Sequence, residues 1–285
     1  MKKIGLILEG GANRGIFTAG VLDLFKSKDI YLPYVVSVSV GTCNAIDYVS
    51  KQFGRTKECM IPNGRNVPPV SIQNIPKKKT MINLDMVFDE YPNHLVPFDY
   101  ATYWSSDIIS EYVVTNCITG QAEYLSEKQD AKRLMNICRA SCSMPYLSPI
   151  TMLDGIPYLD GGIADAVPIR HARSLGYEKN IVVLTREKGY FKRDLGILNM
   201  MDNVLYRKYP RLIRQLKSRI KRYNKTIELL EKLEERKDVL IIRPSKVLVG
   251  RTGNNTKRLN QFYQQGYQIG KRRLREIQEF IDLGV

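Results

Sequence analysis

Apolar residues along the chain alternate between short runs typical of strands and three-to-four-residue spacings typical of helices. The runs predict strands at 2–8, 34–38, 111–117, 180–185 and 238–243, with shorter pieces near 147–152 and 156–159. The helical spacings predict helices at 15–27, 40–51, 127–140 and 168–175. Because the two patterns alternate, we expect an α/β layered fold rather than an all-α or all-β one.

The last third of the chain predicts two long helices, at 210–236 and 256–282. Residues at spacings of three and four form one apolar stripe on the first, namely Ile213, Leu216, Ile220, Tyr223, Ile227 and Leu230. Such a stripe is typical of a face that packs on a core, and a membrane-facing stripe is the alternative. We expect the stripe to pack inward and the basic faces of this helix to point outward.

Two stretches lack a clear period. Residues 60–80 are rich in Pro, Asn and Lys and predict a long loop, of the kind that often forms a functional lid or stays disordered. Residues 81–105 are rich in aromatic residues and prolines, and their pattern does not assign them to a helix, a strand or a loop. With no internal repeat and no linker, we expect one domain over 1–285, with a motif core at 1–185 and a basic helical part at 186–285.

Composition favours a soluble globular protein. The chain is 44% hydrophobic and 26% charged, and no apolar run approaches the roughly 18 residues that cross a bilayer. The N-terminus lacks the long apolar region of a secretory signal, so we expect a cytoplasmic protein. The odd number of cysteines predicts reduced thiols; they are Cys43, Cys59, Cys117, Cys138 and Cys142. Cys138 and Cys142 lie one helical turn apart, but with two histidines and no Cys-x-x-Cys pair we expect no metal site.

The net charge of +15 is unevenly placed. Residues 186–225 hold thirteen Lys or Arg and three acidic residues, which is two-thirds of the excess charge. Such a stretch is either a solvated helix face or a surface attracted to anionic lipid or nucleic acid.

A glycine-rich turn follows the first predicted strand, and its residues are Gly10, Gly11, Ala12, Asn13, Arg14 and Gly15. Turns of this kind hold pyrophosphate in dinucleotide-binding folds, but those folds need an acidic residue at the end of the second strand. Ser37, Val38 and Ser39 occupy that place, so a dinucleotide site is not expected. The same small residues allow a substrate oxyanion to approach the backbone N–H groups closely.

The second strand ends in Ser37-Val38-Ser39-Val40-Gly41, which approximates the G-x-S-x-G nucleophile elbow. An elbow is a strained strand-to-helix turn that exposes a serine hydroxyl, and the helix predicted at 40–51 supplies the required context. An ordinary turn with a serine helix cap is the alternative.

A carboxylate suited to activating that serine follows the strand-like piece at 156–159, where Asp160 precedes Gly161 and Gly162. Two glycines predict a tight turn that aims the side chain. A simple turn aspartate is the alternative, and Asp154-Gly155 is a nearby pair without the second glycine.

Together these motifs resemble the patatin-like phospholipase family, which has G-G-G-x-R-G, G-x-S-x-G and D-G-[GA] in this order. Residues 139–145 (RASCSMP) and 164–169 (ADAVPI) fit as well, so the motifs cover roughly 1–185. The chain departs from the pattern at Ala12, in place of the third loop glycine, and at Ser37, in place of the first elbow glycine. The resemblance implies a three-layer α/β/α fold with a mainly parallel central sheet and the nucleophile on a strand-to-helix elbow.

The resemblance also implies a phospholipase or esterase that cleaves lipid or other carboxylic esters with a Ser–Asp dyad and no cofactor. Ser39 would be the nucleophile and Asp160 the base. The oxyanion loop would be Gly10 to Arg14, with the N–H groups of Gly11 and Ala12 as donors. A Ser–Asp–His triad would need a late histidine, and only His94 and His171 exist. We expect His171 to be a surface or capping residue rather than a base.

Lipid or ester substrates are the expected partners, with peripheral contact to the anionic inner membrane surface through the basic stretch. The alternative is a weakly active or inactive family member that binds anionic lipid or nucleic acid through the basic C-terminal region. No nucleic-acid motif supports specific binding to nucleic acid.

Overall fold

One mixed sheet organises the computed structural model, which describes residues 3–61, 82–193, 198–253 and 255–283. Its strands are β1 (Ile4–Leu8), β2 (Tyr34–Val38), β3 (Ile109–Asn116), β4 (Ala122–Leu125), β5 (Thr151–Leu153), β6 (Ile156–Asp160), β7 (Lys179–Val183) and β8 (Val239–Ile242). The order is β5-β6-β3-β2-β1-β7-β8, and β4 also pairs with β3. Neighbouring strands in the run β3-β2-β1-β7-β8 are parallel. Strands β4 and β6 pair antiparallel with β3, and β5 pairs antiparallel with β6.

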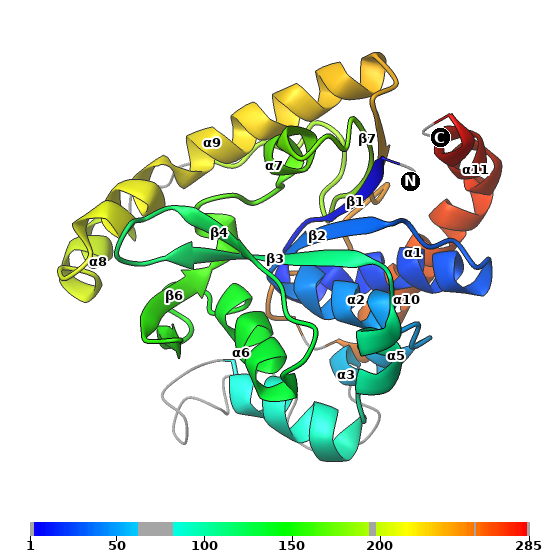
Figure 1. The fold of residues 1–285 in the computed structure, drawn as a ribbon. Helices are drawn as coiled ribbons and strands as arrows, with labels where there is room; N and C mark the ends of the chain where they lie inside the picture. Colours follow the sequence, from blue (N-terminus) through cyan, green and yellow to red (C-terminus); the bar gives the residue numbers. More distant parts are fainter. Residues whose placement is uncertain (1–2, 62–81, 194–197, 254, 284–285) are drawn as a thin grey trace.

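Helices cover both faces of this sheet (Figure 1). One layer contains α7 (Ile169–Ser174) and α9 (Pro210–Glu235); the other contains α1 (Gly15–Ser27), α2 (Val40–Val49), α6 (Ala131–Ser141) and α10 (Thr256–Arg272). The shorter elements are η1 (Ala12–Arg14), α3 (Arg55–Met60), η3 (Met86–Leu95), α5 (Tyr100–Ser105), η4 (Gly161–Ile163), α8 (Leu198–Leu205) and α11 (Leu274–Asp282). The expected three-layer α/β/α fold with a mainly parallel sheet is confirmed.

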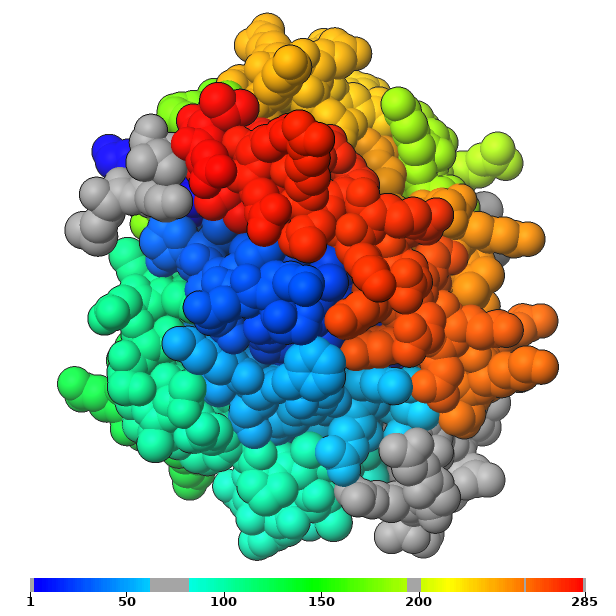
Figure 2. All heavy atoms as spheres, turned by 90° about the vertical axis from the view of Figure 1, so that its right-hand side faces the viewer, coloured from blue at the N-terminus to red at the C-terminus, as the bar shows by residue number. Residues whose placement is uncertain are grey.

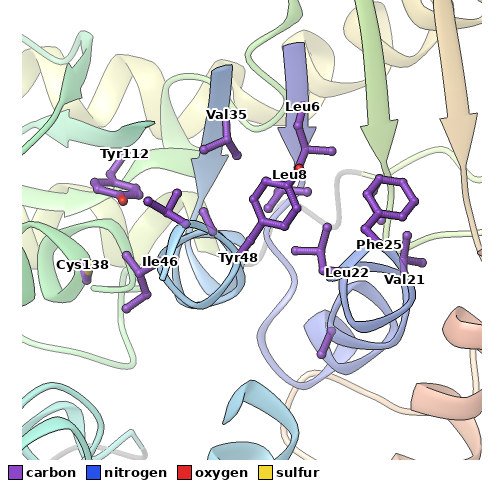
Figure 3. Packing of buried hydrophobic residues seen from close by; sticks show 14 of the residues in the cluster. Leu6, Leu8, Val21, Leu22, Phe25, Val35, Ile46, Tyr48, Tyr112 and Cys138 are labelled. Carbon is purple, nitrogen blue, oxygen red and sulfur yellow. The ribbon is translucent and has the colours of Figure 1, made fainter. Parts of the chain in front are cut away.

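The main core lies between the sheet and α1, α2 and α6 (Figure 3). Leu8 of β1 and Val35 of β2 meet Leu22 and Ile46, and all four are at most 3% exposed. Burying each such side chain contributes about 1.5–3 kcal/mol. This packing fixes the ends of β1 and β2 and the starts of α1 and α2, which are the two turns that carry the predicted motifs.

The C-terminal region packs against the N-terminal one. Figure 2 shows the helices α10 and α11, in orange and red, beside the blue segment that contains α1. A Cβ on Gly20 of α1 would lie 2.1 Å from the carbonyl oxygen of Tyr263, and one on Gly266 of α10 would lie 2.1 Å from that of Phe17. Backbones therefore touch at both glycines. With β8 in the same sheet as β7, these contacts support our proposal that residues 1–285 form one domain.

The helix at 210–236 packs inward, as its apolar stripe predicts. Tyr223, Ile227 and Leu230 join the core on the second face of the sheet, and Leu216 joins a smaller cluster. Ile220 is only partly buried. No helix in the described ranges has the length and apolar character to cross a bilayer.

Two sequence predictions need correction, and one unassigned stretch can now be described. The single helix expected at 256–282 is two, because α10 ends before Arg273, whose guanidinium donates to the Ile241 carbonyl oxygen at 2.5 Å. The strand expected near 147–152 is confined to β5, and Tyr146 before it has φ of 69°. Residues 81–105, which the sequence pattern leaves unassigned, contain η3 and α5. The loop expected at 60–80 lies, from 62 on, outside the described residues.

Candidate active site

Ser39 occupies a strained turn between β2 and α2. Its φ and ψ are 56° and −129°, a conformation that costs a residue with a side chain on the order of 1–3 kcal/mol. Two hydrogen bonds hold the turn: the Ser39 N–H donates to Ser141 Oγ at 2.9 Å, and the Thr42 N–H donates to the Ser39 carbonyl oxygen at 2.7 Å. Ser39 is also at the positive end of the α2 dipole, which favours developing negative charge. The geometry is that of a nucleophile elbow.

The residues around the elbow explain why its sequence departs from the usual pattern. Ser37, in place of the first glycine, is fully buried, and its hydroxyl donates to Thr42 Oγ1 at 3.4 Å. Thr42 Oγ1 is in turn 3.0 Å from Ser141 Oγ. The last glycine is required sterically, because a Cβ on Gly41 would lie 2.7 Å from the Leu8 carbonyl oxygen. The first glycine position of the motif therefore tolerates Ser37, because a hydroxyl network accommodates its side chain. The last position, Gly41, requires glycine.

Asp160 ends β6, and the sheet brings it to Ser39. Asp160 pairs with Val114 of β3, and the neighbouring Val113 pairs with Val38 of β2. The side chain is 7% exposed, and burial raises the pKa of Asp160 above its ordinary value. A hydrogen bond from the Ser39 side chain and one from the Gly162 N–H (2.8 Å to Oδ1) oppose this rise. The structure thus joins the predicted hydroxyl and carboxylate, although 120 residues separate them in sequence.

The two glycines after Asp160 aim the carboxylate. A Cβ on Gly161 would lie 2.2 Å from the Val113 carbonyl oxygen, so the chain crosses directly over β3 there. The Gly162 N–H holds the carboxylate in the 3₁₀ turn η4. Asp154, by contrast, belongs to the exposed hairpin turn between β5 and β6 and pairs with Arg133 at 2.8 Å.

The loop after β1 lies against the elbow. A Cβ on Gly10 would lie 2.8 Å from Ser39 Cβ, and one on Gly15 would lie 2.5 Å from Val40 Cγ1. The Asn13 N–H donates to the Arg251 carbonyl oxygen at 3.2 Å, and Asn13 Nδ2 donates to Gly253 at 2.9 Å. Asn13 therefore anchors the loop to the segment after β8.

Two backbone donors of this loop stay available. Within the described residues, the N–H groups of Gly11 and Ala12 donate to no acceptor. A Cβ on Gly11 would lie 2.7 Å from Thr185 Oγ1, so this position also requires glycine. Arg14 is 4% exposed, and burial and the nearby Arg186 lower the pKa of Arg14 to about 10, so it stays charged at neutral pH.

Ala12 adopts φ of 51°, the left-handed region that a glycine occupies without strain. We expect Ala12→Gly to raise the free energy of unfolding by up to about 1 kcal/mol, because relief of strain exceeds the entropy gained by the unfolded chain. Ala101→Gly, in the exposed first turns of α5, should instead lower it by roughly 0.5–1 kcal/mol. Urea unfolding measures both. Equal losses in the two variants would show that Ala12 is unstrained.

Two cavities meet at Ser39. The larger has a volume of about 600 Å³ and is lined by Ser39, Asp160, residues 9–12 and several cationic side chains. The smaller, of about 120 Å³, is mainly apolar and is lined by Ile46, Val87, Phe88 and Met135 among others. Ala12, Ser39 and Met144 border both cavities. An ester carbonyl at Ser39 would therefore have an apolar space on one side and a charged space on the other.

His171 lies away from this site. Its Nε2 is 2.7 Å from Glu111 Oε2, and its ring stacks on Tyr124 with centroids 3.4 Å apart. Glu111 also accepts a hydrogen bond from Tyr34, at 2.5 Å. His171 borders neither cavity at Ser39. His94 is exposed in η3.

The cysteines form no metal centre in the described part of the chain, where no three His, Cys, Asp or Glu side chains cluster to hold an ion. Cys138 is fully buried in the core. Cys142 Sγ lies 4.0 Å from Cys43 Sγ beside the apolar cavity, and its pKa is raised by the contact with Cys43 and by burial.

Several residues of the site have no signal in the sequence motifs. Ser141 lies in the RASCSMP segment that fits the family pattern, but nothing in the letters shows that its hydroxyl holds the elbow. Lys192 and Arg219 belong to the basic stretch at 186–225, yet charge alone does not show that they line the cavity. Arg251 lies in a segment that predicts no function.

The chain is similar to known proteins in sequence and in fold. A family model described as Patatin-like phospholipase matches residues 6–173, and one described as a domain of unknown function (DUF6363) matches residues 209–282. The chain is 30% identical over 196 residues to the uncharacterized protein YjjU of Escherichia coli K12, which covers 64% of this chain and 52% of YjjU. It is 23% identical over 296 residues to lysophospholipase NTE1 of Phaeosphaeria nodorum, covering 98% of this chain and 19% of NTE1.

The chain thus spans about half of one curated relative and about a fifth of the other. Among solved structures, it resembles VipD from Legionella pneumophila with a TM-score of 0.53 and 14% identity, covering all of this chain and 67% of VipD. This likeness concerns the fold alone.

Proposed function

The chain belongs to the patatin-like phospholipase family, and from this premise we propose that it hydrolyses lipid acyl esters with a Ser39–Asp160 dyad. The observation that carries the proposal is that the Ser39 elbow, the buried Asp160 carboxylate and the backbone of Gly11 and Ala12 line one cavity. A raised carboxylate pKa makes a stronger base, and a strained elbow exposes the hydroxyl that the base activates.

The proposed reaction has two steps. Ser39 Oγ attacks the ester carbonyl carbon while its proton passes to Asp160, and the N–H groups of Gly11 and Ala12 hold the oxyanion. The bond to the alcohol then breaks, and Asp160 returns the proton to the departing alcohol oxygen. In the second step water attacks the acyl-serine, Asp160 takes its proton, and the carboxylic acid leaves as Ser39 recovers its hydroxyl. Each oxyanion donor contributes on the order of 3 kcal/mol.

The two cavities orient the substrate. The apolar cavity at Ile46, Val87 and Met135 suits the start of an acyl chain, so the alcohol portion occupies the larger, charged cavity. Apart from the ester and the attacking water, every group in these steps is a side chain or backbone N–H of this chain, and the proposal includes no metal or organic cofactor.

A lipid substrate also calls for contact with a membrane surface. Met201, Val204 and Leu205 of α8 are 44%, 73% and 54% exposed, and the exposed cations Arg207 and Lys208 follow them. An apolar patch next to cations suits an anionic interface, where each nearby cation contributes about 1 kcal/mol. We therefore propose a cytoplasmic enzyme that binds the inner membrane surface peripherally. The alternative, an inactive protein that binds anionic lipid or nucleic acid, predicts binding without turnover.

Active-site labelling tests the proposal. We expect a fluorophosphonate probe to modify Ser39 alone, as mapped by peptide mass spectrometry, because its hydroxyl lies on a strained elbow in the cavity that the buried Asp160 carboxylate also lines. His171→Ala should be labelled and should hydrolyse a monoacylglycerol within about threefold of the wild-type rate, since His171 contacts Glu111 rather than the dyad. An unlabelled Ser39 would overturn the proposal. A loss of several orders of magnitude in His171→Ala would replace the dyad with a triad.

A further inference from the structure

The larger cavity beside Ser39 has a strongly cationic wall. Seven Lys or Arg side chains line it, whereas its carboxylates are Glu9, Asp160 and Asp202. The cations come from the oxyanion loop, the segment after β7, helix α9 and the segment after β8; they are Arg14, Arg186, Lys192, Arg193, Lys217, Arg219 and Arg251. We call these seven residues the cationic wall.

In the part of the chain that the structure describes, the cationic wall makes no direct ion pair, although the nearby Glu9 carboxylate offsets part of the charge of Arg14 and Lys192. Within the described residues, none of the seven side chains pairs with a carboxylate or donates a hydrogen bond. Arg14 is 4% exposed and borders the cavity, and its buried Nε has no partner; the Nε of Arg186 is also buried and unpartnered. Unpaired buried donors are costly in a folded protein, so their retention around a cavity indicates a missing anionic ligand.

The three carboxylates are already engaged. Glu9 accepts from the Thr185 N–H at 2.6 Å and from the Tyr223 hydroxyl at 2.9 Å. Asp160 accepts from the Gly162 N–H, and Asp202 accepts from the Tyr146 hydroxyl. The cations also repel one another: burial, together with Arg251, Arg14 and Arg219, lowers the pKa of Lys192 to about 8, although Glu9 opposes the shift.

We infer that the cationic wall binds a doubly charged phosphate monoester on the alcohol portion of the substrate. The inference rests on the proposed function, because the cavity is the leaving-group side of Ser39. A neutral glycerol leaves the wall unpaired, and a zwitterionic head group brings an ammonium group among like charges. A phosphate monoester supplies two negative charges and several acceptor oxygens that match arginine forks. The substrate class is therefore a monoacyl or diacyl glycerol phosphate.

Hydrolysis by the wild-type protein provides the first test. With one acyl chain throughout, we expect kcat/KM for monoacylglycerol phosphate to exceed that for monoacylglycerol and for lysophosphatidylcholine at least tenfold, mainly through KM. Equal values for the three substrates would overturn the inference and leave the proposed function standing.

A matched pair on α9 assigns the effect to the wall. Arg219 lines the cavity, whereas Lys221, two residues later, is exposed and outside it. Arg219→Gln should lower the preference for monoacylglycerol phosphate over monoacylglycerol about tenfold, and Lys221→Gln should leave the preference at the wild-type value. Equal effects of the two variants would show that general surface charge, not the wall, attracts the substrate.

Binding separates the inference from the proposed function. Dodecyl phosphate, which has no ester of a carboxylic acid, should bind Ser39→Ala and wild type equally in calorimetry, and Arg219→Gln should weaken it about tenfold. If no acyl ester is hydrolysed but this binding persists, the proposed function fails and the phosphate site stands. Inorganic phosphate should bind at least tenfold more weakly than dodecyl phosphate; equal affinities would indicate a site for free phosphate and overturn the head-group assignment.

Discussion

Replacing Asp160 with Asn is expected to lower kcat/KM for acyl ester hydrolysis about 10³-fold while the protein stays folded. General base catalysis is worth roughly 10²–10⁴-fold, and an amide does not accept the Ser39 proton. Gly162 can still donate to the Asn oxygen, so the turn is kept. Ser39→Ala should cost at least as much, and the double variant no more than the larger single loss, because the two side chains act as one unit. Steady-state hydrolysis of a monoacylglycerol, with circular dichroism for folding, measures this.

The pH profile provides a second measurement of the same variant. Asp160 must be ionised to act as a base, and burial raises its pKa, so kcat/KM should rise with pH and level off above that raised value. The acidic limb should therefore lie above the pH at which an ordinary aspartate ionises, about 3.9. Asp160→Asn should remove the limb from whatever activity remains. Activity within tenfold of wild type, or an unchanged limb, would rule out Asp160 as the base.

Although Asp160→Asn should lower activity, it should raise the stability of the folded protein. The pKa of Asp160 is higher in the folded protein than in the unfolded chain, so the unfolded chain loses this proton first as the pH rises. The stability that the protonated Asp160 contributes is therefore complete below the unfolded-state pKa, and it is lost as the pH rises to the folded-state pKa. Wild type therefore carries a destabilising buried carboxylate at neutral pH, and Asp160→Asn does not. We expect the variant to unfold at higher urea concentration than wild type at pH 7, with the difference fading towards pH 3. Such a trade of stability for function is common at active sites.

The residues proposed as the dyad could be picked out of the sequence because the backbone geometry around them places demands on neighbouring residues. Gly41 and Gly161 sit where a Cβ would collide with backbone carbonyl oxygens at 2.7 Å and 2.2 Å. Steric restrictions of this kind require glycine at fixed distances in sequence from Ser39 and Asp160, and these glycines can be recognised in the sequence. The two departures, Ala12 and Ser37, are small enough for the same backbone: one accepts a positive φ and the other gains a hydrogen-bond partner.

The cationic wall could not be predicted, because charge along a sequence does not say which way a side chain points. Arg219 and Lys221 are two basic residues only two positions apart in the sequence, yet Arg219 lines the cavity and Lys221 faces solvent. Arg251 is held near the cavity by a hydrogen bond from the Asn13 N–H to its carbonyl oxygen, and the two residues are 238 positions apart in the sequence. Contacts at such separations have no local pattern.

The same reasoning explains the missed boundaries. The apolar spacing of the last helix continues through Arg273, where the break comes from a side-chain hydrogen bond to β8 rather than from a helix-breaking residue. Helix η3 has the wider π pattern and contains Pro92, so a search for a 3.6-residue period does not find it. The local spacing of apolar residues thus predicted α1 and β2 with their observed bounds, whereas it did not predict where α10 ends or where η3 lies.

The crossing of α1 and α10 links stability to the site. Helix α1 begins at Gly15, directly after the proposed oxyanion loop at residues 10–14, and α10 follows the segment of Arg251 and Gly253 that accepts hydrogen bonds from Asn13. Gly20 and Gly266 let the two helix backbones touch. Any change that separates the helices should therefore weaken the fold and also loosen the anchor of the proposed oxyanion loop.

We expect Gly266→Ala to lower the free energy of unfolding by about 2 kcal/mol and Gly266→Val to lower it further. An added Cβ would lie 2.1 Å from the Phe17 carbonyl oxygen, which is backbone and cannot turn aside. Overpacking costs roughly 1–3 kcal/mol, which exceeds the gain of about 1 kcal/mol that alanine brings to a helix. Urea unfolding with Gly250→Ala as control, where a Cβ meets no atom within 4 Å, measures the difference. Because the contact is steric, the loss should grow with side-chain size; a Gly266→Ala variant as stable as wild type would show that the helices separate freely.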